Sequence, residues 1–298
     1  MLERTFLHVR LVGEKREQYL WENGIRSWRD FSPSSENLDL PPKVLASLVS
    51  GLAESEKRLL SRDWDYFARA LRHKHLYRMY PYLADRTLFL DIETTGVRSL
   101  RNAVTIIGCY DGVSPRVFVQ GRDLDEFPAY IKRFSLVVTF NGKEFDIPFL
   151  ERALHMRIDT PHIDLRRELA ALGVLGGLKK IERELGIERQ SQVAELNGYA
   201  AVVLWERYRK RNDTAALDTL IHYNIADTVS LERLLHVVYN KRMESYGFPD
   251  RVAEKPIPVV THPYSPEVIA EIMPRVERVT GKKRPVIDTP PTNENAPA

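Results

Sequence analysis

The order of strand and helix signals after residue 86 is the feature that most constrains the fold of this 298-residue chain. Short apolar runs that predict strands occupy residues 87–90, 102–110, 115–120, 136–140 and the neighbourhood of 163. Helical patterns follow the third run, at 123–134, and the fourth run, at 148–156, and a longer helical pattern covers 178–239. Three strands, a helix, a strand, a helix, a strand and further helices are typical of an α/β fold in which helices flank a mixed sheet.

Two other regions surround this α/β segment. Residues 1–83 carry helical apolar spacing and predict a small all-α region, whereas residues 84–242 contain the predicted α/β domain. Residues 243–298 are predicted to be a proline-rich extension with a disordered tail, because 289–295 have nothing to bury. With 43% hydrophobic residues, the chain has material for one full domain and a smaller appendage.

The composition excludes some classes of protein and leaves others open. No apolar run approaches the ~20 residues of a membrane span, and the acid at Glu3 argues against a signal peptide, so we expect a cytoplasmic protein. One cysteine, Cys109, cannot form an internal disulfide or a cysteine-cluster zinc site, and its apolar neighbours predict a core position. The net charge of +3 permits nucleic-acid binding without indicating it.

Two acids, Asp91 and Glu93, directly follow the first apolar run. Residues two apart on a strand point to the same face, so the two carboxylates are predicted to lie side by side. Adjacent carboxylates repel each other unless a cation lies between them, and magnesium or manganese suits a site made only of oxygen atoms. The alternative is a strand end with exposed acids. The longer string D-I-E-T-T-G at 91–96 is more specific than the two acids alone.

A third acid, Asp146, ends the string F-N-G-K-E-F-D at 140–146. Asn141 and Gly142 within it give a turn signal after an apolar strand. The alternative for Asp146 is an ordinary helix N-cap, because a proline follows two residues later.

A fourth acid, Asp227, belongs to the helix predicted over residues 213–239. It borders the apolar stripe of that helix, with Tyr223 one turn earlier on the same side. An acid beside a core needs a partner, and a metal ion shared with Asp91 would supply one. The alternative is a boundary acid that reaches solvent.

Together, D-I-E-T-T-G at 91–96, F-N-G-K-E-F-D at 140–146 and Y-N-x-x-D at 223–227 resemble the motifs of the DEDD-type 3′–5′ exonucleases, which have a ribonuclease-H-like fold. Proofreading domains of family B polymerases carry similar strings, and the closest resemblance is to the YprB-like predicted exonucleases. The resemblance extends over residues 86–239.

The resemblance implies a two-metal mechanism. Asp91, Glu93 and Asp227 would hold two magnesium or manganese ions roughly 4 Å apart, and Asp146 would act at or beside the second ion. The ions would acidify a bound water and stabilise charge on the phosphate and on the leaving 3′ oxygen. Tyr223 would orient that water, because a free tyrosine with a pKa near ~10 is a poor base at neutral pH.

The water-orienting residue could by spacing be either Tyr223 or His222, since both tyrosine and histidine branches exist in this superfamily. At about 100° per residue, Tyr223 lies about 40° from Asp227 around the helix and His222 about 140°. The geometry therefore favours Tyr223. Asp164, another acid after a short strand, is a further candidate whose role is open.

Substrate contacts are predicted for Arg98 and Arg101, which follow the first motif, and for Asn141 and Lys143 in the second. One of the two arginines, or Lys143, would meet the nucleic-acid backbone near the scissile phosphate. The alternative is an ordinary solvated basic loop.

The stretch at 12–25 resembles a degenerate helix-hairpin-helix, a motif that binds the DNA backbone through amides of a glycine turn. Arg10 and Leu11 replace the extra glycine that the motif usually has, so a small helical packing module is the alternative.

We therefore expect a metal-dependent 3′–5′ exonuclease acting on DNA or RNA, with a single-stranded 3′ end as substrate and no membrane partner. A structure-specific endonuclease on the same fold is a second reading. A nucleic-acid-binding protein with a decayed site is a third, and the presence of all four acids argues against it.

Overall fold

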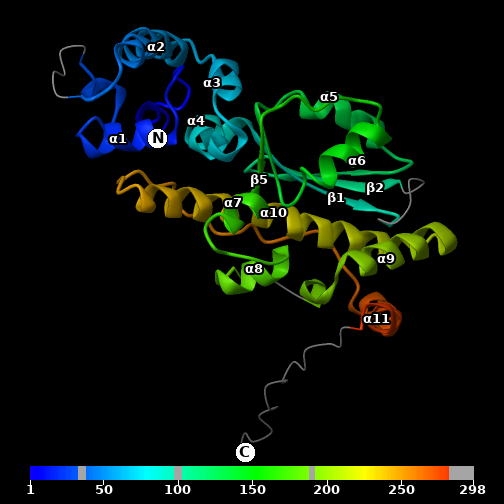
Figure 1. The fold of residues 1–298 in the computed structure, drawn as a ribbon. Helices are drawn as coiled ribbons and strands as arrows, with labels where there is room; N and C mark the ends of the chain where they lie inside the picture. Colours follow the sequence, from blue (N-terminus) through cyan, green and yellow to red (C-terminus); the bar gives the residue numbers. More distant parts are fainter. Residues whose placement is uncertain (33–37, 97–102, 188–191, 282–298) are drawn as a thin grey trace, which may run out of the picture.

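The computed structural model describes residues 1–32, 38–96, 103–187 and 192–281 (Figure 1). Its α-helices are α1 (Glu14–Glu22), α2 (Pro42–Leu60), α3 (Trp64–Ala70), α4 (Tyr80–Leu83), α5 (Phe127–Ile131), α6 (Asp146–Ala153), α7 (Leu165–Ala170), α8 (Leu178–Glu184), α9 (Gly198–Arg211), α10 (Thr214–Ser245) and α11 (Pro266–Thr280). The predicted disordered tail lies outside the described residues.

A five-stranded mixed sheet forms the centre, in the order β3-β2-β1-β4-β5. Its strands are β1 (Thr87–Thr94), β2 (Val104–Tyr110), β3 (Pro115–Val119), β4 (Leu136–Thr139) and β5 (His162–Asp164). β1, β2 and β3 pair antiparallel, whereas β4 is parallel to β1 and β5 is parallel to β4. This sheet, with helices on both faces, confirms the fold class predicted from the order of strands and helices.

Alternation along β1 divides its side chains between two cores. Leu88 and Leu90 pack with apolar residues of α5 and α6, whereas Phe89 belongs to the larger core that includes α10. Figure 1 shows α5 and α6 on one face of the sheet and α9 and α10 on the other. Asp91 and Glu93 share the parity of Phe89, so the strand directs both acids toward α10.

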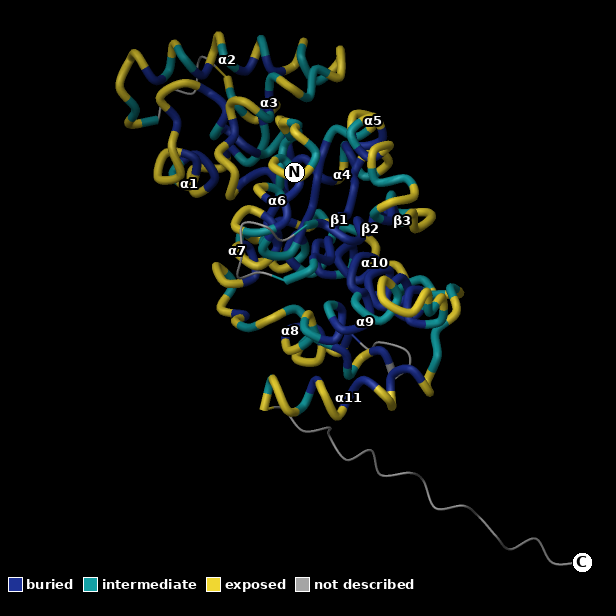
Figure 2. Tube along the Cα trace, turned by 90° about the vertical axis from the view of Figure 1, so that its right-hand side faces the viewer, coloured by how far each residue is buried: buried dark blue, intermediate teal, exposed yellow. Residues whose placement is uncertain are grey.

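Helix α10 crosses the sheet and is buried along most of its length (Figure 2). The carboxylate of Asp213 caps its start by accepting a hydrogen bond from the backbone N–H of Ala216 at 3.1 Å. The helix approaches β2 closely at Gly108, where an added Cβ would lie 2.0 Å from Oδ1 of Asn224. Glycine at this position therefore permits the contact, and Gly108 is the register partner of Asp91.

The N-terminal helices are fastened to the C-terminal end of α10 through a buried arginine. Arg78 is 1% exposed and donates hydrogen bonds to Glu17 and Thr5. Beside it, the hydroxyl groups of Tyr77 and Tyr246 lie 2.9 Å apart. A buried charge needs such a set of partners, so these contacts fix the N-terminal region against the sheet domain. The division of the chain into three regions and the helix-hairpin-helix interpretation stay predictions.

One helical expectation differs from the structure. The helix expected over 123–134 is a 3₁₀ turn, Leu124–Glu126, followed by α5, which begins where Pro128 can lie in a first turn without losing a hydrogen bond. Within the predicted all-α region, residues 64–79 form α3, an extended break and the 3₁₀ helix η3 (His73–Met79). No helix among the described residues is long and apolar enough to cross a membrane.

Candidate active site

Three of the four predicted acids meet where β1 passes under α10. Asp91 and Glu93 from β1 and Asp227 from α10 each place a carboxylate oxygen so that the three atoms lie within 4.8 Å of one another. Glu93 and Asp227 are buried and Asp91 is partly buried. Oxygen ligands at this spacing suit a hard divalent cation such as magnesium or manganese.

The electrostatics of this cluster are unfavourable without a cation. Burial, together with the negative charge of Asp227, holds the pKa of Glu93 well above its ordinary value. The nearby ammonium of Lys179 acts in the opposite direction and offsets part of this effect. Like charges gathered in a buried place raise one another's pKa, and a bound divalent ion would remove the conflict. The donor set therefore fits a metal site.

Asp146 lies beside β1 but outside the group of three. It begins α6 and is 2% exposed, and its Oδ1 accepts a hydrogen bond from the backbone N–H of Ile92 at 3.1 Å. Burial raises the pKa of Asp146 to about 7. Its charge also contributes to the raised pKa of Glu93, so the two acids are electrostatically linked across the strand.

Tyr223 and His222 point to different parts of the molecule. Tyr223 lines the same pocket as Asp91, Glu93 and Asp227. The Nδ1 atom of His222 instead lies 2.6 Å from the carbonyl oxygen of His262, in the chain that leads to α11. The helix therefore separates the two side chains as its 100° spacing requires.

Two polar residues near the acids were given no role in the site by the sequence analysis. The amide of Asn224 is fully buried and its Nδ2 donates to Oδ2 of Asp91 at 2.9 Å. The spacing places Asn224 in the apolar stripe of the helix, and a buried amide in such a stripe indicates a partner. Lys179 of α8 holds its ammonium 4.5 Å from the ring centroid of Tyr223. Nothing in the local pattern around Lys179 identifies this contact.

The acids line a pocket of about 800 Å³ that extends to the C-terminal helix. Aromatic side chains of Phe145 and Tyr199 form part of its wall, and Val279 and Thr280 at the end of α11 form another part. The pocket thus joins residues from five separate stretches of the chain.

Among the described residues, the other predicted site residues do not line the pocket of the clustered acids. Both carboxylate oxygens of Asp164 accept backbone N–H groups, from Asn141 at 2.9 Å, Lys143 at 3.1 Å and Arg166 at 3.1 Å. Asp164 therefore fixes the loop after β4 and caps α7, and it is not one of the three clustered acids. Oδ1 of Asn141 accepts from Arg166, and Lys143 lines a different cavity. Arg98 and Arg101 lie outside the described residues.

Comparison with known proteins finds one matching family and several solved structures of distant similarity. The family model of the RNase_H superfamily matches residues 88–239. The family B DNA polymerase of the hyperthermophilic archaeon Pyrobaculum calidifontis is 18% identical with a TM-score of 0.38, over 57% of this chain and 30% of the polymerase. Brucella melitensis NrnC bound to pGG is 16% identical with a TM-score of 0.36, over 68% of this chain and 91% of NrnC. The NrnC structure with bound Mg2+ is 15% identical with a TM-score of 0.38 over the same shares. A search of curated proteins finds no match.

Proposed function

Because this chain belongs to the RNase H superfamily, we propose that it is a metal-dependent 3′–5′ exonuclease that hydrolyses phosphodiester bonds of DNA or RNA. The observation that carries the proposal is the cluster of Asp91, Glu93 and Asp227, whose oxygens converge within 4.8 Å in a pocket. The family explains the fold, and the carboxylates supply the chemistry.

The three clustered carboxylates, with Asp146 beside them, would hold two divalent ions, magnesium or manganese. Such ions, when bound, acidify a water molecule and stabilise the charge that develops on a phosphate. Asn224 holds the carboxylate of Asp91 in one orientation through its 2.9 Å hydrogen bond, so this ligand is preorganised.

The side chain of Tyr223 is the candidate for orienting the attacking water. It is buried beside the acids, and the ammonium of Lys179 lies over its ring. A tyrosine hydroxyl both donates and accepts hydrogen bonds, so it can orient a water molecule. This assignment places the reaction in the tyrosine branch of the exonucleases that the sequence resembles.

The wall of the pocket suits one nucleotide strand. Phe145 and Tyr199 offer rings on which bases can stack, and the end of α11 adds the apolar side chain of Val279. These features support a single-stranded 3′ end as the substrate. A cytoplasmic location goes with the proposal, supported by the single buried thiol of Cys109.

Matched single strands of DNA and RNA, labelled at the 5′ end and carrying either a free or a blocked 3′ hydroxyl, would test the proposal. With magnesium or manganese, we expect stepwise shortening of the free strands and no shortening of the blocked ones. The Asp91→Ala variant is the control for contaminating nucleases. Internal cleavage of blocked strands would instead assign an endonuclease, and binding without any cleavage would assign a nucleic-acid-binding protein.

A further inference from the structure

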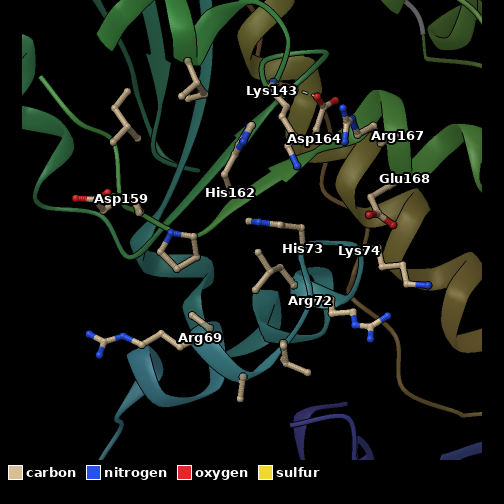
Figure 3. Close-up of a pocket in the computed structure, with 18 of the residues that line it drawn as sticks. Arg69, Arg72, His73, Lys74, Lys143, Asp159, His162, Asp164, Arg167 and Glu168 are labelled. Atoms are coloured by element: carbon tan, nitrogen blue, oxygen red, sulfur yellow. Dashed lines mark hydrogen bonds between the residues drawn. The ribbon is translucent and has the colours of Figure 1, made fainter. Parts of the chain in front are cut away.

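A second and larger cavity lies between the N-terminal helices and the sheet domain. Its volume is about 1080 Å³, and none of the three clustered acids lines it. Its walls come from α3 and the following 3₁₀ helix, from the loop after β4, from residues 158–162 and from α7. Figure 3 shows the lining side chains on both walls of this space.

Basic side chains come from both walls. The N-terminal wall provides Arg69, Arg72, His73 and Lys74, and the opposite wall provides Lys143 with His162 and Arg167. Figure 3 shows His73 and Lys143 on opposite walls of this space, with His162 on the same wall as Lys143. Arg72, His73, Lys74 and Lys143 are exposed, so an anion that enters the cavity can reach them.

The acids of the cavity offset only part of this charge, because some are engaged elsewhere, Asp65 pairs with a single arginine, and Asp159 lies exposed on the wall of residues 158–162. Asp164 uses both oxygens on backbone N–H groups, and Glu168 lies 3.3 Å from Arg242. Asp65 pairs with Arg69 at 3.6 Å. Burial also raises the pKa of Glu168 to about 7, so part of its charge is absent near neutral pH.

Two cations of the cavity remain when the ion pairs of the described residues are counted. Lys74 pairs with Glu14 at 2.5 Å, and Arg167 pairs with Glu144. Within the described part of the chain, neither Arg72 nor Lys143 has an ion-pair partner. Exposed cations that face a cavity in this state are available to a polyanion.

One loop connects the cavity to the catalytic pocket. Lys143 and Ile147 line the cavity, whereas Phe145, between them, lines the pocket of the clustered acids. Asp164 fixes this loop through the backbone N–H groups of Asn141 and Lys143. The two spaces therefore share residues of one loop, over which a strand can be tested for a path from the pocket to the cavity.

We propose that this cavity binds the sugar–phosphate backbone of the nucleic-acid substrate upstream of its 3′ end, with Arg72, His73 and Lys143 contacting phosphate oxygens. The choice of occupant rests on the proposed exonuclease function. Phosphate contacts of this kind hold a strand in position without reading its sequence. His162 acts as a neutral hydrogen-bonding neighbour, since burial lowers its pKa to about 4 and its Nε2 lies 2.8 Å from Oγ1 of Thr139.

The test is charge reversal of the two available cations, Arg72→Glu with Lys143→Glu. Both side chains are exposed, so the fold should be retained. The matched control reverses two other exposed lysines, Lys43→Glu with Lys132→Glu, which change the net charge equally and line neither cavity. Binding of a labelled single-stranded 20-mer is measured over a salt series in EDTA, so that the readout does not depend on hydrolysis.

We expect the cavity variant to bind the 20-mer at least tenfold more weakly than the control variant. The slope of log K against log salt should flatten by about 1 to 2, because each lost phosphate contact removes about 0.7 for a single strand. A dinucleotide, which occupies less of the path to the cavity, should lose less kcat/KM in this variant than the 20-mer does.

Equal weakening in both variants, or an equal loss on the dinucleotide, would overturn the proposal. A thermal shift by inorganic phosphate that the cavity variant loses, with unchanged 20-mer affinity, would show that the ligand is a free phosphate. Failure of the exonuclease proposal can be distinguished from failure of this one. In that case the parent would not hydrolyse the strand, while the difference in 20-mer binding between the two variants would remain.

Discussion

The pocket lined by the clustered acids and the larger cavity lined by basic side chains share the loop of residues 143–147, yet they are built in opposite ways. The pocket gathers acids from a central strand and a buried helix, whereas the cavity gathers exposed basic side chains from a 3₁₀ helix and loops. Rigid elements hold ligand atoms within the small tolerance that metal chemistry needs. Backbone binding by long cationic side chains tolerates looser support, because a phosphate has no sequence information to read.

The same contrast holds for the energetics. The clustered carboxylates repel one another in the folded protein, so this pocket lowers the stability of the fold until a cation binds. The exposed cations of the cavity remain hydrated and cost little. We therefore expect variants of the pocket to change turnover and metal response, and variants of the cavity to change strand binding.

The largest expected effect is at Asp91. Asp91→Ala removes one of three converging ligands, and turnover should fall about 10³-fold or more, which corresponds to several kcal/mol of lost transition-state stabilisation. Binding of a 20-mer in EDTA should stay within about threefold, because the removed group does not hold the strand. The exposed Asp85→Ala is the control. If Asp91→Ala keeps a tenth of the parent turnover with its melting temperature unchanged, the catalytic assignment is wrong.

The next effect concerns Tyr223 and its neighbour His222. Tyr223→Phe should lower the single-turnover rate about 10²-fold, at the lower end of what a positioned proton-handling group contributes. His222→Ala should leave the rate within about threefold and lower the melting temperature, because it removes the contact with the carbonyl of His262. The reverse ranking of the two rates would move the protein to the histidine branch.

A third prediction uses pH to test the buried carboxyl group of Asp146 beside the pocket. Asp146 has its pKa raised to about 7 from 3.8, so between these values the folded metal-free protein holds a proton that the unfolded chain has released. The contribution of Asp146 to the stability of the metal-free protein should therefore grow as the pH falls from 8 through 7, and it is measured as the difference between the parent and Asp146→Asn, because Glu168 and the buried histidines titrate as well. Glu93, with its pKa also raised, acts in the same direction.

Divalent ions should reverse this trend, because they compete with protons for the same carboxylates. At about 100 times its Kd, an ion adds roughly 2.7 kcal/mol, or roughly 5 °C or more in melting temperature, at pH 8 and much less at pH 6. The double variant Asp91→Ala with Asp227→Ala should show neither gain. An equal shift in this variant and in the parent would place the ions elsewhere.

The sequence predicts the pocket of the clustered acids far better than it predicts the cavity. The strands and the acids after the first of them follow from local patterns, since strand alternation alone directs Asp91 and Glu93 to one face. The basic residues at 69–74 are equally visible in the sequence, but only as part of a helical segment. Their meeting with Lys143 depends on how the N-terminal helices pack on the sheet domain, and no local period encodes that packing.

Asn224 shows the same limit on a smaller scale. Helical spacing places it correctly in the buried stripe of α10, but its hydrogen bond to Asp91 joins residues 133 positions apart. The contact also needs Gly108 on the neighbouring strand, where any side chain would collide with the amide. The motif therefore identifies the ligands, and the residue that orients one of them becomes visible only when the strand and the helix are in place.

The smallest expected effect tests this orienting role. Asn224→Leu keeps the size of the buried side chain and removes the donor to Asp91, so the ligand loses its fixed orientation. Loss of such a partner typically costs about tenfold or somewhat more in metal affinity, and we expect that shift in the metal concentration at half-maximal activity. The control is Thr228→Val, one turn further along α10 and also close to Gly108. The hydroxyl of Thr228 donates to the backbone carbonyl of Asn224 and not to an acid. A role in packing alone would lower the melting temperature of both variants and leave their metal dependence equal to that of the parent. A shift in metal dependence confined to Asn224→Leu would show that the helix orients its strand-borne ligand, and the 20-mer affinity, set by the cavity, should be the same in all three proteins.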